Sequence, residues 1–173
     1  WQTLLGEKAV TSSDDQKLVE EIVVTVTPTL SADDERLPMY AEKLARSAAT
    51  VIALDRAEAL LRQFTGEQHR TREAWIAIVA KRLRSGRSHT DSFFNAVAAL
   101  DDEGLQEFVR RERLDLGTDF QRLSWQAFRA TEYLPAVDRI ATALNEVWPN
   151  ERPRFTERLT QWRTEAQVTD HRV

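Results

Sequence analysis

Apolar residues recur every three or four positions along most of this chain, which is the period of an α-helix with one buried face. The longest such run extends from Pro38 to Phe64, and no glycine or proline interrupts it. Ser31 and Asp34 form a plausible capping pair before this run, and Gly66 is a suitable stop after it. The pattern therefore predicts one amphipathic helix of about 27 residues.

Five further segments carry the same period, and turn or capping residues separate them. They are a helix opened by Thr71 that ends near Gly86, a helix opened by Thr90, a helix opened by Asp101, a run from Phe120 to Trp148 with a break or kink near Pro135, and a last helix that begins near Pro153. The acidic residues at these helix starts are favourable there, because the positive end of the helix dipole stabilises carboxylates.

The segment from Ile22 to Thr27 allows two interpretations. Every residue in it is β-branched, which favours a strand locally, and Pro28 ends it. A lone strand has no partner, however, and the sequence contains no second convincing strand. We therefore favour a helix that runs on to Thr27, or an extended N-terminal arm, over a strand.

These segments predict an all-α fold: a compact bundle of six to seven helices, with or without an extended N-terminal arm. We expect an N-terminal segment over residues 1–30, one helical domain over residues 31–168 and a frayed tail over residues 169–173. The sequence shows no internal repeat of fixed period, which argues against a solenoid.

The composition excludes several kinds of functional site but does not identify a function. The chain has no cysteine, which excludes disulfide scaffolds, zinc–thiolate sites and cysteine nucleophiles. Its histidines, His69, His89 and His171, do not stand in metal-ligand spacing, and its five glycines form no phosphate-binding loop. We therefore predict no metal and no cofactor.

Our expectation for the cellular location of the protein rests on features that the sequence lacks. No run of 18 uncharged apolar residues is present, so we expect no contact with a membrane, and the lack of cysteine fits the cytoplasm. The sequence begins at Trp1 rather than at methionine, so we expect a processed chain or part of a longer one.

The formal net charge of −4 hides an uneven distribution. Residues 1–42 hold three basic residues against nine acidic ones, whereas residues 62–89 hold seven basic residues against two acidic ones. Arginines make up most of the basic residues, which fits either a GC-rich genome or bidentate contacts to carboxylates and phosphates. The basic stretch can thus face a phosphate backbone, or pair with the acidic N-terminal third.

The basic stretch predicts a candidate nucleic-acid interface. Arg70, Ala74, Ala77, Lys81 and Arg84 follow one another at gaps of three and four, and therefore share one face of a helix. We expect this face to point away from the apolar side chains of the same helix, with Arg82 and Arg87 beside it. Cations separated by small alanines suit sequence-independent contact with phosphates. The candidate nucleic-acid-binding residues are Arg70, Lys81, Arg82, Arg84 and Arg87.

A second motif overlaps this stretch. Arg84 and His89 stand as Arg-x4-His, and Arg62 and His69 stand as Arg-x6-His. This spacing resembles the motif of the HEPN family of small helical ribonucleases. The resemblance implies that Arg84 and His89 are catalytic: histidine would move a proton near neutral pH, and arginine would stabilise charge on the scissile phosphate. Gly86, which lies between the two, departs from the helical setting of the family motif.

The patterns favour a non-catalytic subunit, or a protein-interaction module, of a larger assembly with one or more protein partners. Tryptophans near the ends of the predicted elements, Trp1, Trp148 and Trp162, could anchor such a partner, because tryptophan is enriched at interface hot spots. The alternatives are a subunit that contacts nucleic acid through residues 70–87, and a small ribonuclease.

Overall fold

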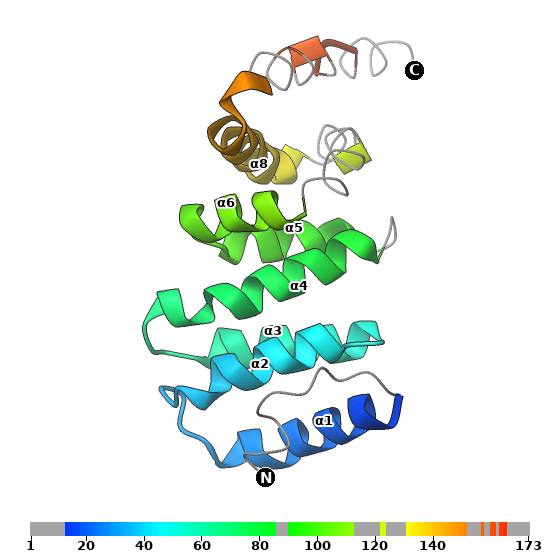
Figure 1. Cartoon of the computed structure of the whole chain (residues 1–173), viewed down its shortest axis with the longest axis vertical. Helices are drawn as coiled ribbons and strands as arrows, with labels where there is room; N and C mark the ends of the chain where they lie inside the picture. The colour runs from blue at the N-terminus through cyan, green and yellow to red at the C-terminus, as the bar shows by residue number, and fades with distance from the viewer. Residues whose placement is uncertain are drawn as a thin grey trace. The chain divides into compact units, whose positions relative to one another are not determined.

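The computed structural model describes residues 13–85, 90–112, 122–123, 131–151, 157, 160–161 and 163–165. The protein is all-α, as predicted, and the described residues contain no strand (Figure 1). The chain forms two compact units, residues 1–81 and residues 82–173, and their boundary falls inside one helix, α4. The predicted division into a segment, one helical domain and a tail stays a prediction.

Helix α1 spans Ser13–Val26, so the ambiguous β-branched segment is helical. Val19, Ile22 and Val23 are its buried residues, and their spacing places them on one helical face. The single-turn 3₁₀ helix η1, Thr27–Thr29, follows directly and contains Pro28. Burial of one face therefore outweighs the local β-propensity of the valines and threonines.

The single helix predicted from residue 38 to residue 64 is wrong, because two helices occupy this stretch. Helix α2 spans Arg36–Ser47, and helix α3 spans Val51–Gln63. Thr50 is the N-cap of α3: its backbone is extended, and its side-chain oxygen accepts a 3.3 Å hydrogen bond from the Ala53 amide. The sequence signal for this break was a threonine cap, which needs neither glycine nor proline.

Packing explains why the chain turns here. The two helices lie side by side (Figure 1), and a three-residue connection makes them antiparallel neighbours. Ala41, Ala45, Ala53 and Ala57 are fully buried, and their small side chains let the two backbones approach closely. A single long helix would leave these apolar stripes without a partner.

Helix α4, Arg72–Arg84, follows the 3₁₀ helix η2, Gln68–Thr71. Side-chain contacts join it to the α2–α3 pair. The Arg62 guanidinium lies over the Trp75 ring, 5.5 Å from its centroid, and Arg46 forms an ion pair with Glu73 at 3.5 Å. Unit 1 is thus a layered arrangement of α1, the α2–α3 pair and the first part of α4.

Unit 2 contains helices α5 (Thr90–Ala99), α6 (Asp102–Arg111) and α8 (Leu134–Val147), and the single-turn helices η4 (Thr131–Tyr133) and η5 (Pro149–Glu151). Asp101 caps α6 as predicted, because its carboxylate accepts a 2.8 Å hydrogen bond from the Gly104 amide. Pro135 lies in the first turn of α8, where its missing N–H costs nothing.

The core of unit 2 lies where α8 packs against α5 and α6. Its fully buried side chains include Phe93, Phe94, Phe108, Ile140 and Leu144. No helix in the described part of the chain has both the length and the apolar character that are needed to cross a bilayer.

Candidate functional site

The predicted basic face of α4 is not an exposed surface. All seven residues from Ala74 to Ala80 are buried, so this part of the helix is covered on every side. Ala74 is 1% exposed and Ala77 is 7% exposed, although their spacing in the sequence predicted that both would face solvent. The run of seven uncharged residues was the signal for this outcome, because a helix that is apolar all round is a buried helix.

The first two predicted phosphate-binding cations make their polar contacts within unit 1. Arg70 lies in η2, where it forms ion pairs with Glu35 and, at 3.4 Å, with Glu67. The ammonium of Lys81 lies 3.4 Å from the carbonyl oxygen of Ala48 and donates to it just beyond the end of α2. The contact with Glu35 agrees with the alternative that the basic stretch pairs with the acidic N-terminal third.

Arg82 and Arg84, the other predicted cations that the structure describes, do not share an exposed surface either. Arg82 is 1% exposed, so the expectation that it flanks an accessible basic face is wrong. Arg84 is exposed and forms an ion pair with Glu112, which follows the last turn of α6. Arg87 and His89 lie outside the described residues, so the nucleic-acid and ribonuclease hypotheses stay predictions.

The described part of unit 2 contains a hollow between α6 and α8, which we call the α6–α8 hollow. Its volume is about 330 Å³, which is the lower end of the range typical of ligand pockets. Leu105 and Ala143 are its buried apolar residues, and the other lining residues are polar or charged. The lining residues are Asp102, Leu105, Gln106, Asp138, Arg139, Thr142, Ala143 and Glu146.

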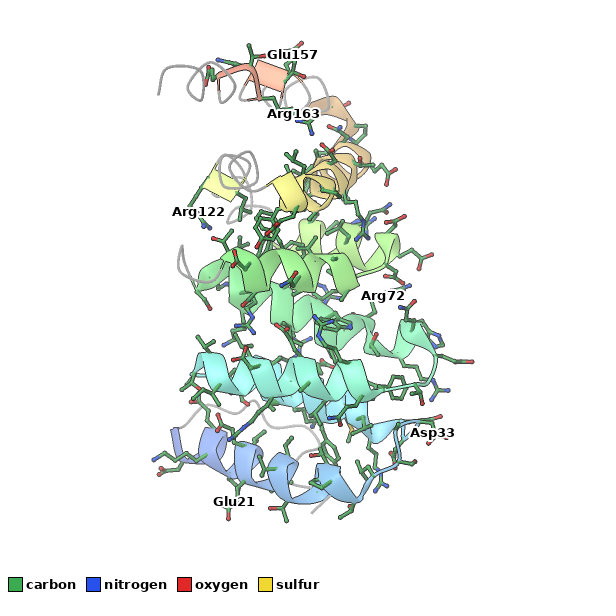
Figure 2. The ribbon with its side chains drawn as sticks, turned by 180° about the vertical axis from the view of Figure 1, so that it is seen from behind. Glu21, Asp33, Arg72, Arg122, Glu157 and Arg163 are labelled. Atoms are coloured by element: carbon green, nitrogen blue, oxygen red, sulfur yellow. The ribbon has the colours of Figure 1, made fainter. Side chains whose placement is uncertain are left out.

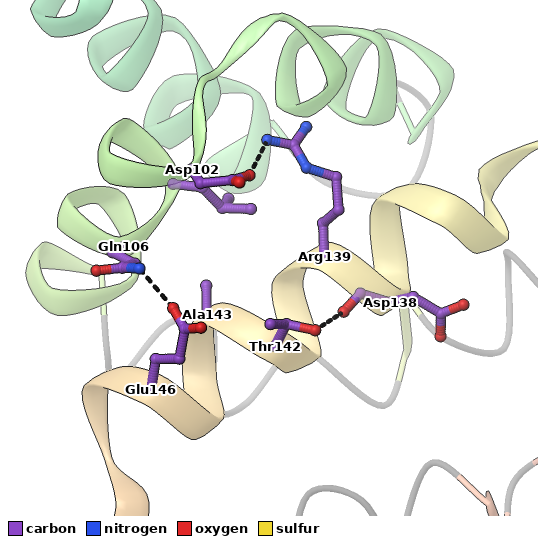
Figure 3. Close-up of a pocket in the computed structure, with 8 residues that line it drawn as sticks. Asp102, Gln106, Asp138, Arg139, Thr142, Ala143 and Glu146 are labelled. Atoms are coloured by element: carbon purple, nitrogen blue, oxygen red, sulfur yellow. Dashed lines mark hydrogen bonds and ion pairs between the residues drawn. The ribbon is translucent and has the colours of Figure 1, made fainter.

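Two polar contacts cross this hollow from one helix to the other (Figure 3). Near one end, the Arg139 guanidinium of α8 bonds to the Asp102 carboxylate of α6 at 3.0 Å. Near the other end, the Gln106 amide donates to the Glu146 carboxylate at 2.5 Å. Thr142 lies between these contacts on α8, and its hydroxyl donates to the carbonyl oxygen of Asp138 at 2.9 Å.

Arg139 also ties α8 to the end of α5. Its guanidinium donates to the carbonyl oxygens of Val97 at 3.2 Å and of Leu100 at 2.7 Å. Val97 lies in the last turn of α5 and its carbonyl oxygen also accepts from the Leu100 amide at 3.2 Å, whereas Leu100 directly follows the helix. A cation at this end faces the negative pole of the helix dipole. Arg139 is therefore engaged with α5 and α6 at once, and its positive charge is largely satisfied within the protein.

A second hollow, the α5–α8 hollow, has a volume of about 390 Å³ and also lies wholly in unit 2. It is lined by Phe94, Asn95, Ala98, Glu132, Tyr133, Pro135, Ala136 and Arg139. The Tyr133 ring stacks on Phe94 with the centroids 4.8 Å apart and the planes 16° from parallel. A hydrogen bond from the Tyr133 hydroxyl to Asp91, together with burial, raises the pKa of Tyr133 to about 12.

The two hollows share Arg139, and one stripe of η4 and α8 borders both. The stripe consists of Glu132, Pro135, Arg139, Thr142 and Glu146, at gaps of three and four, and we call the two hollows together the α8 groove. Over about 14 residues of helix, the stripe is about 21 Å long. Its spacing is visible in the sequence, but the spacing alone does not indicate a site, because a polar helical face is usually no more than a solvated one.

Metal binding finds no support in the part of the chain that the structure describes, where no group of three or more His, Asp or Glu side chains is placed to hold an ion. Comparison of the chain with models of known protein families gives no match, and comparison with curated proteins and with solved structures gives none either.

Proposed function

We propose that this protein is a non-catalytic, protein-interaction module of a larger assembly, and that it holds a segment of a partner protein in the α8 groove. The observation that carries the proposal is the arrangement of apolar and polar side chains along this groove. Phe94, Leu105, Ala136 and Ala143 are buried apolar residues beneath it, and polar side chains stand along its edges. Protein interfaces have this anatomy, with an apolar centre and a polar rim.

The groove also offers a rigid aromatic anchor. Tyr133 is half-buried, and its ring is fixed on one side by the Phe94 stack and at its hydroxyl by Asp91. Tyrosine is enriched at interface hot spots, because it presents a large contact area at a low cost in conformational entropy. A partner side chain that packs on the ring would find it already in place.

The proposal can be tested by selecting peptides on the intact protein and then filling the groove. We would select peptides from a random phage-displayed library and measure the affinity of the enriched sequences for two variants. Thr142→Trp places an indole in the α6–α8 hollow. Thr25→Trp is the matched control, because Thr25 is also exposed on a helix and its hydroxyl donates to the carbonyl four residues earlier.

We expect the enriched peptides to bind the wild type, and we expect Thr142→Trp to weaken binding at least about tenfold, since it obstructs desolvated contacts at the centre of the interface. Thr25→Trp should change the affinity less than about twofold. If no peptide is enriched, or if both tryptophan variants bind equally well, the groove is not a docking site and the proposal fails. Circular dichroism of both variants shows whether each is folded.

A further inference from the structure

The α8 groove carries an imbalance of charge. Among the described residues, four carboxylates line it, those of Asp102, Glu132, Asp138 and Glu146, together with the guanidinium of Arg139. That guanidinium already bonds to two backbone carbonyls and to Asp102. The carboxylates remain accessible: the Asp102 side chain is 88% exposed, and Glu132 and Glu146 are exposed as well. The described carboxylates of the groove therefore outnumber its guanidinium groups, even when Arg163, which pairs with Asp138, is counted.

Two contacts within the protein show which groups these carboxylates accept. The guanidinium of Arg163, from the C-terminal helical segment, lies 2.5 Å from a carboxylate oxygen of Asp138. Figure 2 shows Arg163 extending from that segment toward α8. The amide of Gln106 donates to Glu146 at the far end of the α6–α8 hollow. An arginine already occupies one rim position, so the geometry of the groove suits cationic donors.

We infer that the partner segment is basic and amphipathic, with lysine or arginine side chains that reach the rim carboxylates and apolar side chains that cover the floor. This inference rests on the proposed function and specifies its partner. The distance along the stripe from Glu132 to Glu146 matches a helical segment of about four turns. Lysine and arginine suit such a site, because their aliphatic stems pack on apolar surface while the charged ends stay at the rim.

Charge complementarity of this kind favours one class of partner over another, because a juxtaposed acidic segment would be repelled. The overall charge of the protein gives a weaker version of the same preference, since it is −4. The test must therefore separate the groove from the net charge, and paired variants with equal changes in charge can do so.

The probes are two fluorescent, 14-residue amphipathic peptides that differ only in charge: one carries leucine and lysine, and the other carries leucine and glutamate. The groove variant is Glu132→Lys with Glu146→Lys. The control is Glu21→Lys with Asp33→Lys, which changes the net charge by the same amount at two exposed positions in the other unit. Glu21 and Asp33 both project away from their helix or turn (Figure 2).

We expect the lysine peptide to bind the wild type at least about tenfold more tightly than the glutamate peptide at 20 mM salt, and to lose most of this advantage at 300 mM, where the Debye length is only about 6 Å. The groove variant should weaken the lysine peptide by about tenfold, because each exposed contact changes from attraction to repulsion. The control should weaken it less than about threefold.

Two outcomes overturn the inference. Equal weakening by both double variants would mean that net charge, and not the groove, attracts the peptide. Equal binding of the lysine and glutamate peptides would mean that the partner is not basic. The two failures are distinguishable. If the selected peptides show no preference for basic residues but still lose binding to the Thr142→Trp variant, this inference fails and the proposed function stands.

Discussion

Replacing Arg139 with alanine tests whether this side chain is the polar link between α5, α6 and α8. The wild-type guanidinium makes hydrogen bonds to the carbonyl oxygens of Val97 and Leu100 at 3.2 and 2.7 Å, and to Asp102 at 3.0 Å. The substitution removes all three contacts at once. The Val97 carbonyl keeps its hydrogen bond from the Leu100 amide, whereas the Leu100 carbonyl loses the Arg139 donor.

The three contacts contribute unequally to the free energy of unfolding. The short bond to Leu100 contributes most. A hydrogen bond from a charged donor is worth about 1.5–3 kcal/mol, and the low end applies to this bond because the Arg139 side chain is 33% exposed and water can replace part of the loss. The longer bond to Val97 adds about 0.5–1 kcal/mol. The pair with Asp102 adds less than about 0.5 kcal/mol, because that carboxylate is almost fully exposed. We expect Arg139→Ala to destabilise unit 2 by about 2–3 kcal/mol.

Native-state hydrogen exchange of the α5 amides measures this loss, because it reports the opening free energy of one cooperative unit rather than of the whole chain. Two variants serve as controls. Asp102→Asn removes only the ion pair and should cost less than about 1 kcal/mol. Arg46→Ala removes an exposed arginine that pairs with the carboxylates of Glu42 and Glu73, and it should also cost less than about 1 kcal/mol. If Arg139→Ala costs no more than Arg46→Ala, the reasoning is refuted.

Two further predictions concern pKa values. Hydrogen bonds from Arg36 lower the pKa of Asp34 to about 2. The contribution of Asp34 to stability is therefore complete above the ordinary pKa of 3.8 and is lost as the pH falls toward 2. A carboxyl NMR titration that gives the ordinary pKa for Asp34 would contradict this prediction. The Tyr133 hydroxyl should titrate near pH 12, so its contribution is present below pH 10 and lost as the pH rises to 12. Ultraviolet titration in a Tyr40→Phe background measures the pKa of Tyr133. Asp91→Asn should lower this pKa toward 10. An unchanged pKa would show that the hydrogen bond to Asp91 does not raise it.

The helix content followed from the sequence because it depends on a local period. Phe93, Phe94 and Val97 of α5, for example, recur at helical spacing, and all three are buried. Asp101 was identifiable as a cap, because an acidic residue followed by an apolar periodic run marks a helix start. Such signals reside in neighbouring residues, and no distant contact is needed to interpret them.

Two features depended on tertiary packing instead. The break at Thr50 is favoured because α2 and α3 can then cover one another's alanine-rich faces. The helical spacing of apolar residues continues through the break, so the spacing alone cannot reveal this packing. The choice of helix for the β-branched end of α1 likewise follows from the burial of Ile22 and Val23, and not from their propensity.

The sequence by itself determined which residues are charged, but only the tertiary structure decided which of them face solvent or one another. Spacing placed Lys81 and Arg84 on one helical face, yet the fold directs Lys81 to a carbonyl of unit 1 and Arg84 to Glu112. The α8 groove shows the converse, since Asp102 and Glu146 are 44 residues apart in the sequence and border one hollow. Periodicity fixes the face of a helix, whereas the partner of that face is set by long-range packing, which a local pattern does not encode.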